Sequence, residues 1–345
     1  MSNFLNFGYL QPLNRILKPY VGKVQILVFQ CIVNERQMNV DIALRTISPF
    51  LILMGLGFIS RRVGLLREGD ERVLNSFIYY FALPAFLVSN LSEIDLAQLN
   101  FGFFIAGLMP ILIAFTIFGI LYFLFRFSKG TFCLLIICTV FGNLLFYGIP
   151  FIVFAFPEAG SLATLSAAFI SILAIPITIT LLELYNTRGP GKLENSKRVL
   201  EGLAKNPVIV SVILGVLLSV FKTGLPAPIL SPLNLLGATT IPVGIFLLGV
   251  FFYGRRYSDL AKGFKLSLLR MVLLPAIAFV IAGLVDLSSL ETTTVVIMHG
   301  TPLAIPMIVF SERYNFYKDT IASLLLISSV LGGLYLNVWL LILGH

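Results

Sequence analysis

The sequence predicts an all-α integral membrane protein, and three observations lead to that prediction. Of the 345 residues, 58% are hydrophobic and only 12% are charged. The mean hydropathy is +0.98. About ten apolar runs reach the roughly 20 residues that a helix needs to cross a bilayer. Because soluble domains carry about a quarter of charged residues, this chain is expected to be solvated mainly by lipid.

The predicted membrane-spanning helices fall into two sets of five, which we number along the chain. The first set covers 42–60, 72–92, 99–125, 132–156 and 160–184, and the second covers 206–222, 232–253, 264–285, 290–310 and 319–343. An odd number of spans in each half forces the two halves into opposite orientations. The sequence therefore predicts an inverted-topology 5+5 repeat.

Basic residues alternate along the connections between these spans. Lys and Arg gather after the first, third, fifth, seventh and ninth spans, whereas the other connections hold almost none. Loops rich in Lys and Arg face the cytoplasm. We therefore predict a multi-pass protein of the cell membrane, with both termini of the ten-helix core on the non-cytoplasmic side.

The predicted domain organisation follows from the same pattern. The 1–37 extension carries four basic residues that disturb the alternation, so it is interpreted as a mis-assigned start before Met38 or as an interfacial segment. Residues 38–184 form the first five-helix repeat and 206–345 the second. Between them, 185–205 is a basic cytoplasmic linker, interpreted as a tether or hinge.

The fourth and ninth spans share an interruption in mid-membrane. One reads from Phe141 to Pro150 and the other from His299 to Pro306, each with a Gly, a polar side chain and a closing Ile-Pro. Proline removes a backbone donor, and groups freed in hydrocarbon need partners in protein, water or a bound solute. Paired broken helices in corresponding halves indicate the binding site of a carrier. The candidate substrate-binding residues are Gly142, Asn143, Pro150, His299, Gly300, Thr301, Pro302 and Pro306.

The chemistry of these candidates suits a carboxylate. The Asn143 amide and the Thr301 hydroxyl are donors, and the N-termini of half-helices expose amides with positive potential. Alternatives stay open: Asn143 can instead join two helices, the glycines can serve packing, and the prolines can be kinks. His299 either couples transport to protons or only forms a hydrogen bond within the bundle.

The residues that the chain lacks exclude other classes. No Asp or Glu lies in the centre of any predicted span, which disfavours a cation/proton antiporter. Arg270, about two turns into the eighth span, is expected to snorkel to the cytoplasmic face or else to attract anions. Two histidines, three cysteines and no nucleotide-binding loop indicate a protein that is not an enzyme, with no cofactor and no metal. The formal net charge of +8 arises from basic residues in short loops between apolar runs, which is a topology signal, so no nucleic-acid partner is expected.

Several short stretches together carry a family resemblance. They are Gly55 to Arg62, Leu83-Pro84-Ala85, Gly142-Asn143 through Pro150, Lys205-Asn206-Pro207, Ile241-Pro242, Pro302 to Ala304 and Ser311 to Tyr314. In this order and spacing, residues 40–343 resemble the auxin efflux carrier family in its short, prokaryotic form. The resemblance implies broken, crossing helices 4 and 9, and a scaffold of helices 1, 2, 6 and 7 against a moving unit. It also implies organic acids as substrates.

Energetics then suggest a direction of transport. An anion leaving a cell with an inside-negative potential gains about 2.3 kcal/mol per charge per 100 mV. We therefore expect a secondary transporter of a small organic anion, working by alternating access as an efflux carrier. A sodium- or proton-coupled organic-acid symporter of related fold, and a membrane receptor, stay open as alternatives. The expected partners are the organic acid and the lipid bilayer, and the layout is compatible with a homodimer.

Overall fold

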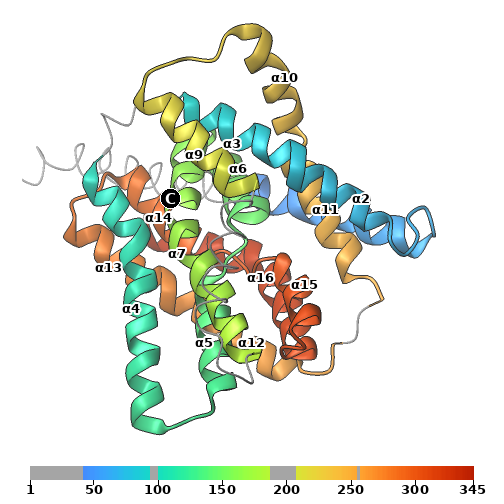
Figure 1. Cartoon of the computed structure of the whole chain (residues 1–345), viewed down its shortest axis with the longest axis vertical. Coiled ribbons are helices and arrows are strands. Elements are labelled where there is room, and N and C mark those ends of the chain that lie inside the picture. The colour runs from blue at the N-terminus through green and yellow to red at the C-terminus, as the bar shows by residue number, and fades with distance from the viewer. Residues whose placement is uncertain (1–41, 94–99, 187–206, 255–256) are drawn as a thin grey trace, which may run out of the picture.

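The chain is built from helices throughout the part that the computed structural model describes, residues 42–93, 100–186, 207–254 and 257–345. Figure 1 shows two groups of helices. The first helix Ile42–Arg62, α2 (Asp70–Phe77), α3 (Leu83–Ser92), α9 (Pro207–Val220), α10 (Ala227–Ala238) and α11 (Thr240–Phe252) pack together. The 1–37 extension and the linker from residue 187 onward lie outside the described residues.

The second group of helices consists of α4 (Phe101–Phe125), α5 (Lys129–Val140), α6 (Ile149–Ala155), α7 (Gly160–Asn186), α12 (Leu260–Leu268), α13 (Leu274–Leu284), α14 (Ser289–His299), α15 (Pro306–Arg313) and α16 (Lys318–Ile342). Most of this group lies in the lower and left part of the view, and α6 lies nearer its centre. Here α12 packs on α16, and α13 packs on α4 and α14.

Seven helical segments within the described residues are long and apolar enough to cross a membrane. They are Ile42–Arg62, Asp70–Ser92, Phe101–Phe125, Pro157–Asn186, Ala227–Phe252, Leu260–Leu284 and Lys318–Ile342. Each coincides with a predicted span, which confirms a multi-pass membrane protein. The sixth predicted span corresponds to the short helix α9, and the fourth and ninth are each divided into two shorter helices.

Three spans contain a π-helical turn directly before a proline. The turns Ile78–Ala82 (η1), Leu144–Gly148 (η3) and Leu269–Leu273 (η5) precede Leu83-Pro84, Ile149-Pro150 and Leu274-Pro275. Proline clashes with the carbonyl four residues earlier and cannot donate to it. The wider turn accommodates that defect, and it rotates the side chains around it relative to a regular helix.

Local capping explains where several helices begin. The Asn100 side chain accepts a hydrogen bond from Gly102 N at 2.8 Å, and Ser128 Oγ accepts one from Thr131 N at 3.1 Å. Ser288 and Glu291 form a reciprocal capping box at the start of α14. These side chains satisfy amides that a helix leaves free at its first turn.

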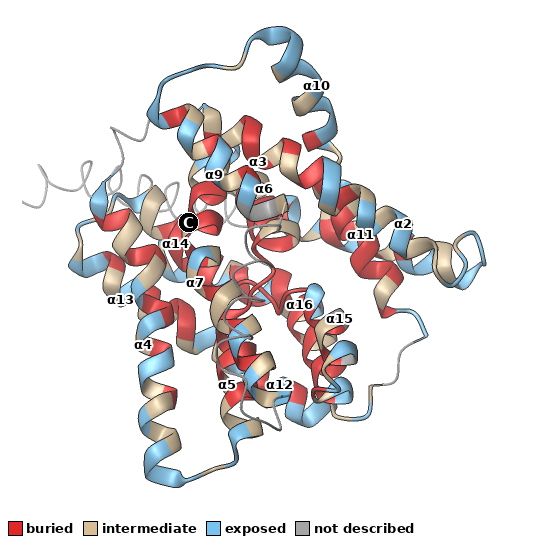
Figure 2. Ribbon diagram, viewed as in Figure 1, coloured by how far each residue is buried: buried red, intermediate tan, exposed pale blue. Residues whose placement is uncertain are grey.

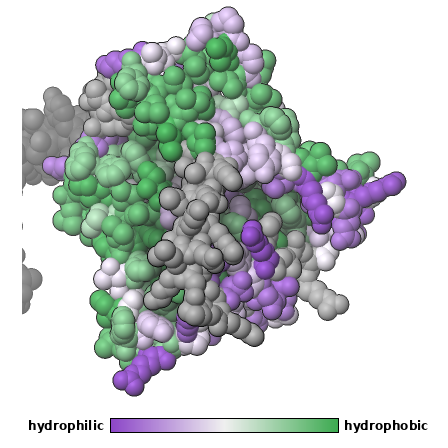
Figure 3. All heavy atoms as spheres, viewed as in Figure 1, coloured by the Kyte–Doolittle hydropathy of each residue, from purple (hydrophilic) through white to green (hydrophobic). Residues whose placement is uncertain are grey.

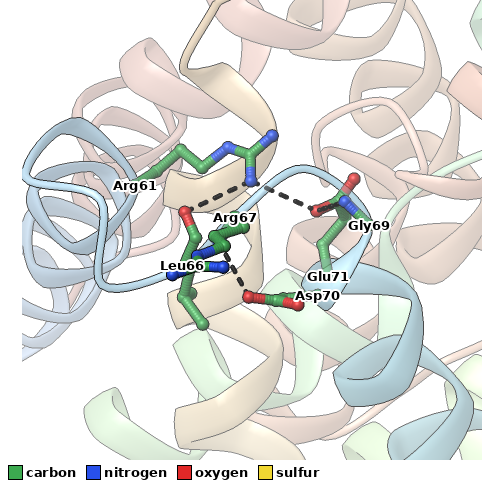
Figure 4. Close-up of polar contacts among 6 residues, drawn as sticks. All are labelled: Arg61, Leu66, Arg67, Gly69, Asp70 and Glu71. Carbon is green, nitrogen blue, oxygen red and sulfur yellow. Dashed lines mark hydrogen bonds and ion pairs between the residues drawn. The ribbon is translucent and has the colours of Figure 1, made fainter.

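The connection between the first helix and α2 is held by charged and backbone contacts (Figure 4). Arg61 Nη1 lies 3.7 Å from Glu71 Oε2 and donates to Leu66 O at 3.3 Å, while Asp70 Oδ2 accepts from Arg67 N at 2.7 Å. Gly69, with φ of 104°, allows the chain to turn there. These contacts fix the short connection between the first helix and α2.

The surface is largely apolar. Figure 3 shows hydrophobic residues over the upper and left parts of the visible face, and hydrophilic residues at the lower tip by the α4–α5 turn, at the right-hand tip by α2 and between these tips near α15. Large side chains such as Phe123 and Leu284 are at least 75% exposed. Such a surface fits an environment of lipid.

Buried residues gather in the middle of the molecule (Figure 2), including chain that is not helical. Polar residues are buried there too, among them Asn143, Arg270, His299 and Thr301. Burying polar groups is costly unless they find partners. The centre is therefore the place where a functional site is expected.

Candidate functional site

The two broken spans meet each other in the centre of the molecule. Helix α5 ends at Val140 and α14 ends at His299, and helical structure resumes at Leu144 and Pro306. Between these ends, Gly142 pairs with Leu303 in an isolated antiparallel bridge. The sequence analysis singled out both interruptions but not their pairing through the backbone.

Hydrogen bonds between the two extended segments satisfy part of the freed backbone. Asn143 N donates to Pro302 O at 2.7 Å, and Ala304 N donates to Phe141 O at 3.0 Å. Leu303 N donates to Ser328 Oγ on α16 at 3.2 Å. Because unpaired amides and carbonyls are costly in a membrane interior, each break supplies partners that the other needs.

Arg270 reaches this crossing from the π-helical turn η5. Its side chain is only 1% exposed. Its Nε donates to Thr301 O at 2.6 Å, its Nη2 donates to His299 O and Thr301 Oγ1 at 3.2 Å each, and its Nη1 donates to Thr139 O. One guanidinium thus connects the end of α5 with the end of α14.

This finding corrects the expectation that Arg270 snorkels to the cytoplasmic face. The span begins at Leu260 rather than 264, so Arg270 is the eleventh of its 25 residues and lies near mid-span. The π-helical turn before Pro275 also alters the direction of its side chain. The signal in the sequence was Arg270 itself, which lies five residues before Pro275 in a span, Leu260–Leu284, that contains no acidic residue.

Gly142 is required by the arginine. A Cβ at position 142 would lie 1.9 Å from Arg270 Nη2 and 2.5 Å from Thr301 Oγ1. No side chain fits at those distances, so the guanidinium packs directly on the backbone of the first break. The absence of a side chain at Gly142 therefore allows the Arg270 guanidinium to lie directly against the backbone.

Asn143 lies at the crossing and is only 3% exposed. Its Oδ1 accepts a hydrogen bond from Phe146 N at 3.2 Å, which caps the helical turn that follows the break. Its Nδ2 has no hydrogen-bond partner among the described residues. A buried amide donor of this kind is costly to leave unpaired, so it is available for a ligand.

His299 contributes its backbone to the crossing, while its ring lies elsewhere. The carbonyl accepts from Arg270, but ring Nε2 lies 3.3 Å from Ala106 O on α4. The ring is fully buried, and Nδ1 has no partner in the described part of the chain. Of the two roles considered from sequence, this geometry fits a hydrogen bond within the bundle.

The other candidates divide between the crossing and its flanks. Thr301 Oγ1 donates to Met298 O at 3.0 Å and accepts a hydrogen bond from Arg270. The Pro302 carbonyl accepts the hydrogen bond from Asn143 N. Gly300 packs against Leu336, where a Cβ would lie 3.1 Å from Cδ2. Pro150 is buried at the second position of α6, whereas Pro306 is exposed at the start of α15.

Two tyrosines that the sequence analysis did not single out lie near the crossing. Tyr147 stacks on Phe50 with ring centroids 4.1 Å apart and donates to Ser329 O at 3.2 Å. Tyr335 on α16 is buried, and its hydroxyl has no partner within the described residues. They belong to apolar runs, so only their position in space distinguishes them from core aromatics.

The described residues contain no group of three or more His, Cys, Asp or Glu placed to hold a metal ion. The site is thus made of backbone, an amide, hydroxyls and one guanidinium. Two helices broken at membrane depth and paired with each other are typical of secondary membrane transporters.

Comparison with known proteins agrees with that class. The family model described as "Membrane transport protein" matches residues 42–340, so the chain belongs to this family, and the match confirms the family recognised from sequence. The chain is 26% identical over 299 residues to the uncharacterized transporter MJ1031 of Methanocaldococcus jannaschii, covering 84% of this chain and 95% of that protein. It is 25% identical over 290 residues to the uncharacterized transporter YfdV of Escherichia coli K12, covering 82% and 92%.

Proposed function

We propose that this membrane transport protein is a secondary carrier of small organic anions, and that the crossing of its two broken helices binds the substrate carboxylate. The observation that carries the proposal is Asn143 Nδ2, which has no hydrogen-bond partner among the described residues. Asn143 is only 3% exposed and lies next to the bridge between Gly142 and Leu303. A carboxylate would accept from such a donor, which removes the cost of burying it unpaired.

The backbone geometry supports the same substrate class. Helical structure begins again at Leu144 and at Pro306, and neither of these starts has an acidic residue in its first turn. The N-terminal end of a helical segment carries partial positive charge. An anion near the crossing is therefore favoured over a cation.

The arrangement of the helices supports alternating access between two bodies. The first helix, α2, α3, α9, α10 and α11 pack with one another, which matches the proposed scaffold of spans 1, 2, 6 and 7. The crossing lies in the other group. We propose that the scaffold holds one position in the membrane while the second group carries the site between the two faces, within a ten-helix inverted repeat.

The proposed driving force is the membrane potential. An organic anion leaving an inside-negative cell gains about 2.3 kcal/mol per charge per 100 mV, so efflux needs no coupling ion. The proposal also places both core termini on the non-cytoplasmic side of the cell membrane, and allows a homodimer through the scaffold.

Transport in proteoliposomes tests the proposal. Radiolabelled mono- and dicarboxylates are screened under an imposed potassium-diffusion potential, with wild type, Asn143→Ala and a control variant. Asn90→Ala is the control, because the Asn90 amide donates within its own helix, to Phe86 O at 2.8 Å. We expect flux that follows the potential, is lost in Asn143→Ala and persists in Asn90→Ala.

Other outcomes separate the alternatives. Flux that requires a sodium or proton gradient would retain the carrier and replace the mechanism with symport. Equal flux in wild type and Asn143→Ala would remove the crossing amide from the substrate site. Folded protein that moves no carboxylate would refute the proposed substrate class.

A further inference from the structure

We propose that Arg270 is the residue that makes the crossing select anions, because it neutralises the carbonyl ends of both broken helices and leaves their amide ends without a counter-charge. This inference rests on the proposed function and assigns its charge selectivity to one side chain. Arg270 is a specificity-determining residue in this view, whether or not its own atoms contact the substrate.

The first step is the position of its hydrogen-bond acceptors. Thr139 is the penultimate residue of α5, and His299 is the last residue of α14. The last carbonyls of a helix have no partner within it and carry partial negative charge. Arg270 donates to one such carbonyl on each helix and to Thr301 O just beyond α14. It therefore caps both C-terminal ends at once.

The second step concerns the opposite ends of the same breaks. Helical structure resumes at Leu144 and at Pro306, and no acidic side chain lies in the first turn of either segment. A cation near these ends would be repelled by their partial positive charge, because no carboxylate compensates it there. The negative helix ends are thus compensated and the positive ends are not, which leaves the crossing with a net positive potential.

The third step is the burial of the charge. The guanidinium is 1% exposed, and its partners in the described part of the chain are three carbonyls and one hydroxyl. Carbonyl dipoles reduce the cost of burying a charge but leave its net charge in place. At low dielectric that charge acts over several ångströms. Asn143 Nδ2 in the same crossing is buried and has no partner among the residues that the structure describes, which is an independent sign of a ligand that accepts hydrogen bonds.

The test compares acids with uncharged molecules of the same shape. Purified protein in liposomes is assayed for flux of benzoate against benzamide and of malonate against malonamide, using wild type, Arg270→Gln, Arg270→Lys and Lys265→Gln. Lys265 is the matched control, because it lies on the same span, is exposed and also carries one positive charge. Size-exclusion chromatography and thermal unfolding identify variants that are folded.

We expect wild type and Lys265→Gln to prefer at least one acid over its amide by about tenfold or more. Arg270→Gln should lower that ratio by about tenfold, and Arg270→Lys should keep most of it. An unchanged ratio in Arg270→Gln would overturn the inference. So would an equal loss in Arg270→Lys, because the role would then be one of shape rather than charge.

Two further outcomes remain informative. If Arg270→Gln does not fold, the ratios of wild type and Arg270→Lys decide, and a wild type that moves acid and amide equally overturns the inference. If wild type moves no acid, the proposed function fails by itself. Thermal stabilisation by the acids then tests Arg270. Stabilisation by acid but not by amide that is lost in Arg270→Gln and kept in Arg270→Lys supports its role, whereas no stabilisation, or an equal loss in Arg270→Lys, overturns it.

Discussion

Replacing Gly142 by alanine should disrupt the hydrogen bonds of Arg270. The new Cβ would lie 1.9 Å from Arg270 Nη2, so the two atoms must separate by more than 1 Å to reach ordinary contact. Both bonds of Nη2, to His299 O and Thr301 Oγ1, are already 3.2 Å long and would break. Each hydrogen bond to a charged group contributes about 1.5–3 kcal/mol, so Gly142→Ala should cost about 3–6 kcal/mol.

Thermal unfolding of the purified protein in detergent measures this loss, with carboxylate flux as a second readout. For a chain of 345 residues, a cost of that size should lower the unfolding temperature by about 4–8 °C. Gly119→Ala is the control, because a Cβ at Gly119 on α4 would meet nothing within 4 Å. It should leave stability unchanged or slightly raised. A Gly142→Ala protein that melts like Gly119→Ala and transports normally would refute the role assigned to the close approach.

Two other predictions concern packing and pH. Gly249→Ala should destabilise the protein by about 1–3 kcal/mol, because its Cβ would lie 1.8 Å from Met54 O on the first helix. Gly283→Ala is the control and should keep the wild-type unfolding temperature, because a Cβ there would meet nothing within 4 Å. Equal unfolding temperatures of the two variants would contradict this prediction. The pKa of Tyr314 is raised from 10.0 to about 12, mainly because the phenol is buried and also because it donates a hydrogen bond to Glu183 Oε1. The protonated phenol therefore stabilises the fold fully below pH 10, and this contribution is lost as the pH rises to 12. Tyr314→Phe should remove that part of the alkaline decline in unfolding temperature, and an identical decline in both proteins would argue against it.

Proline made the interruptions predictable from sequence. Pro150, Pro302 and Pro306 each follow a Gly and a polar side chain within an apolar run, and this combination marked both breaks. Proline alone was not sufficient, because Pro110 and Pro176 lie inside the continuous helices α4 and α7. The boundaries were less accurate. The eighth span begins at Leu260 rather than 264, and this shift changed the depth assigned to Arg270.

The partners of the polar candidates could not be derived from their order in the chain. Asn143 and Thr301 lie at the crossing as expected, but the His299 ring lies against α4, and only its carbonyl serves the crossing. A helix gives each side chain a direction that depends on its rotation. That rotation is set by packing against neighbours distant in the sequence.

Hydropathy, charge and proline content determined by themselves that this chain enters a membrane and where its helices fail, because these depend on local composition and backbone chemistry. Only the tertiary structure decided how the failures are repaired. Gly142 pairs with Leu303, and Arg270 donates to the ends of α5 and α14, because backbone groups freed in hydrocarbon must find partners and the nearest ones come from distant parts of the chain.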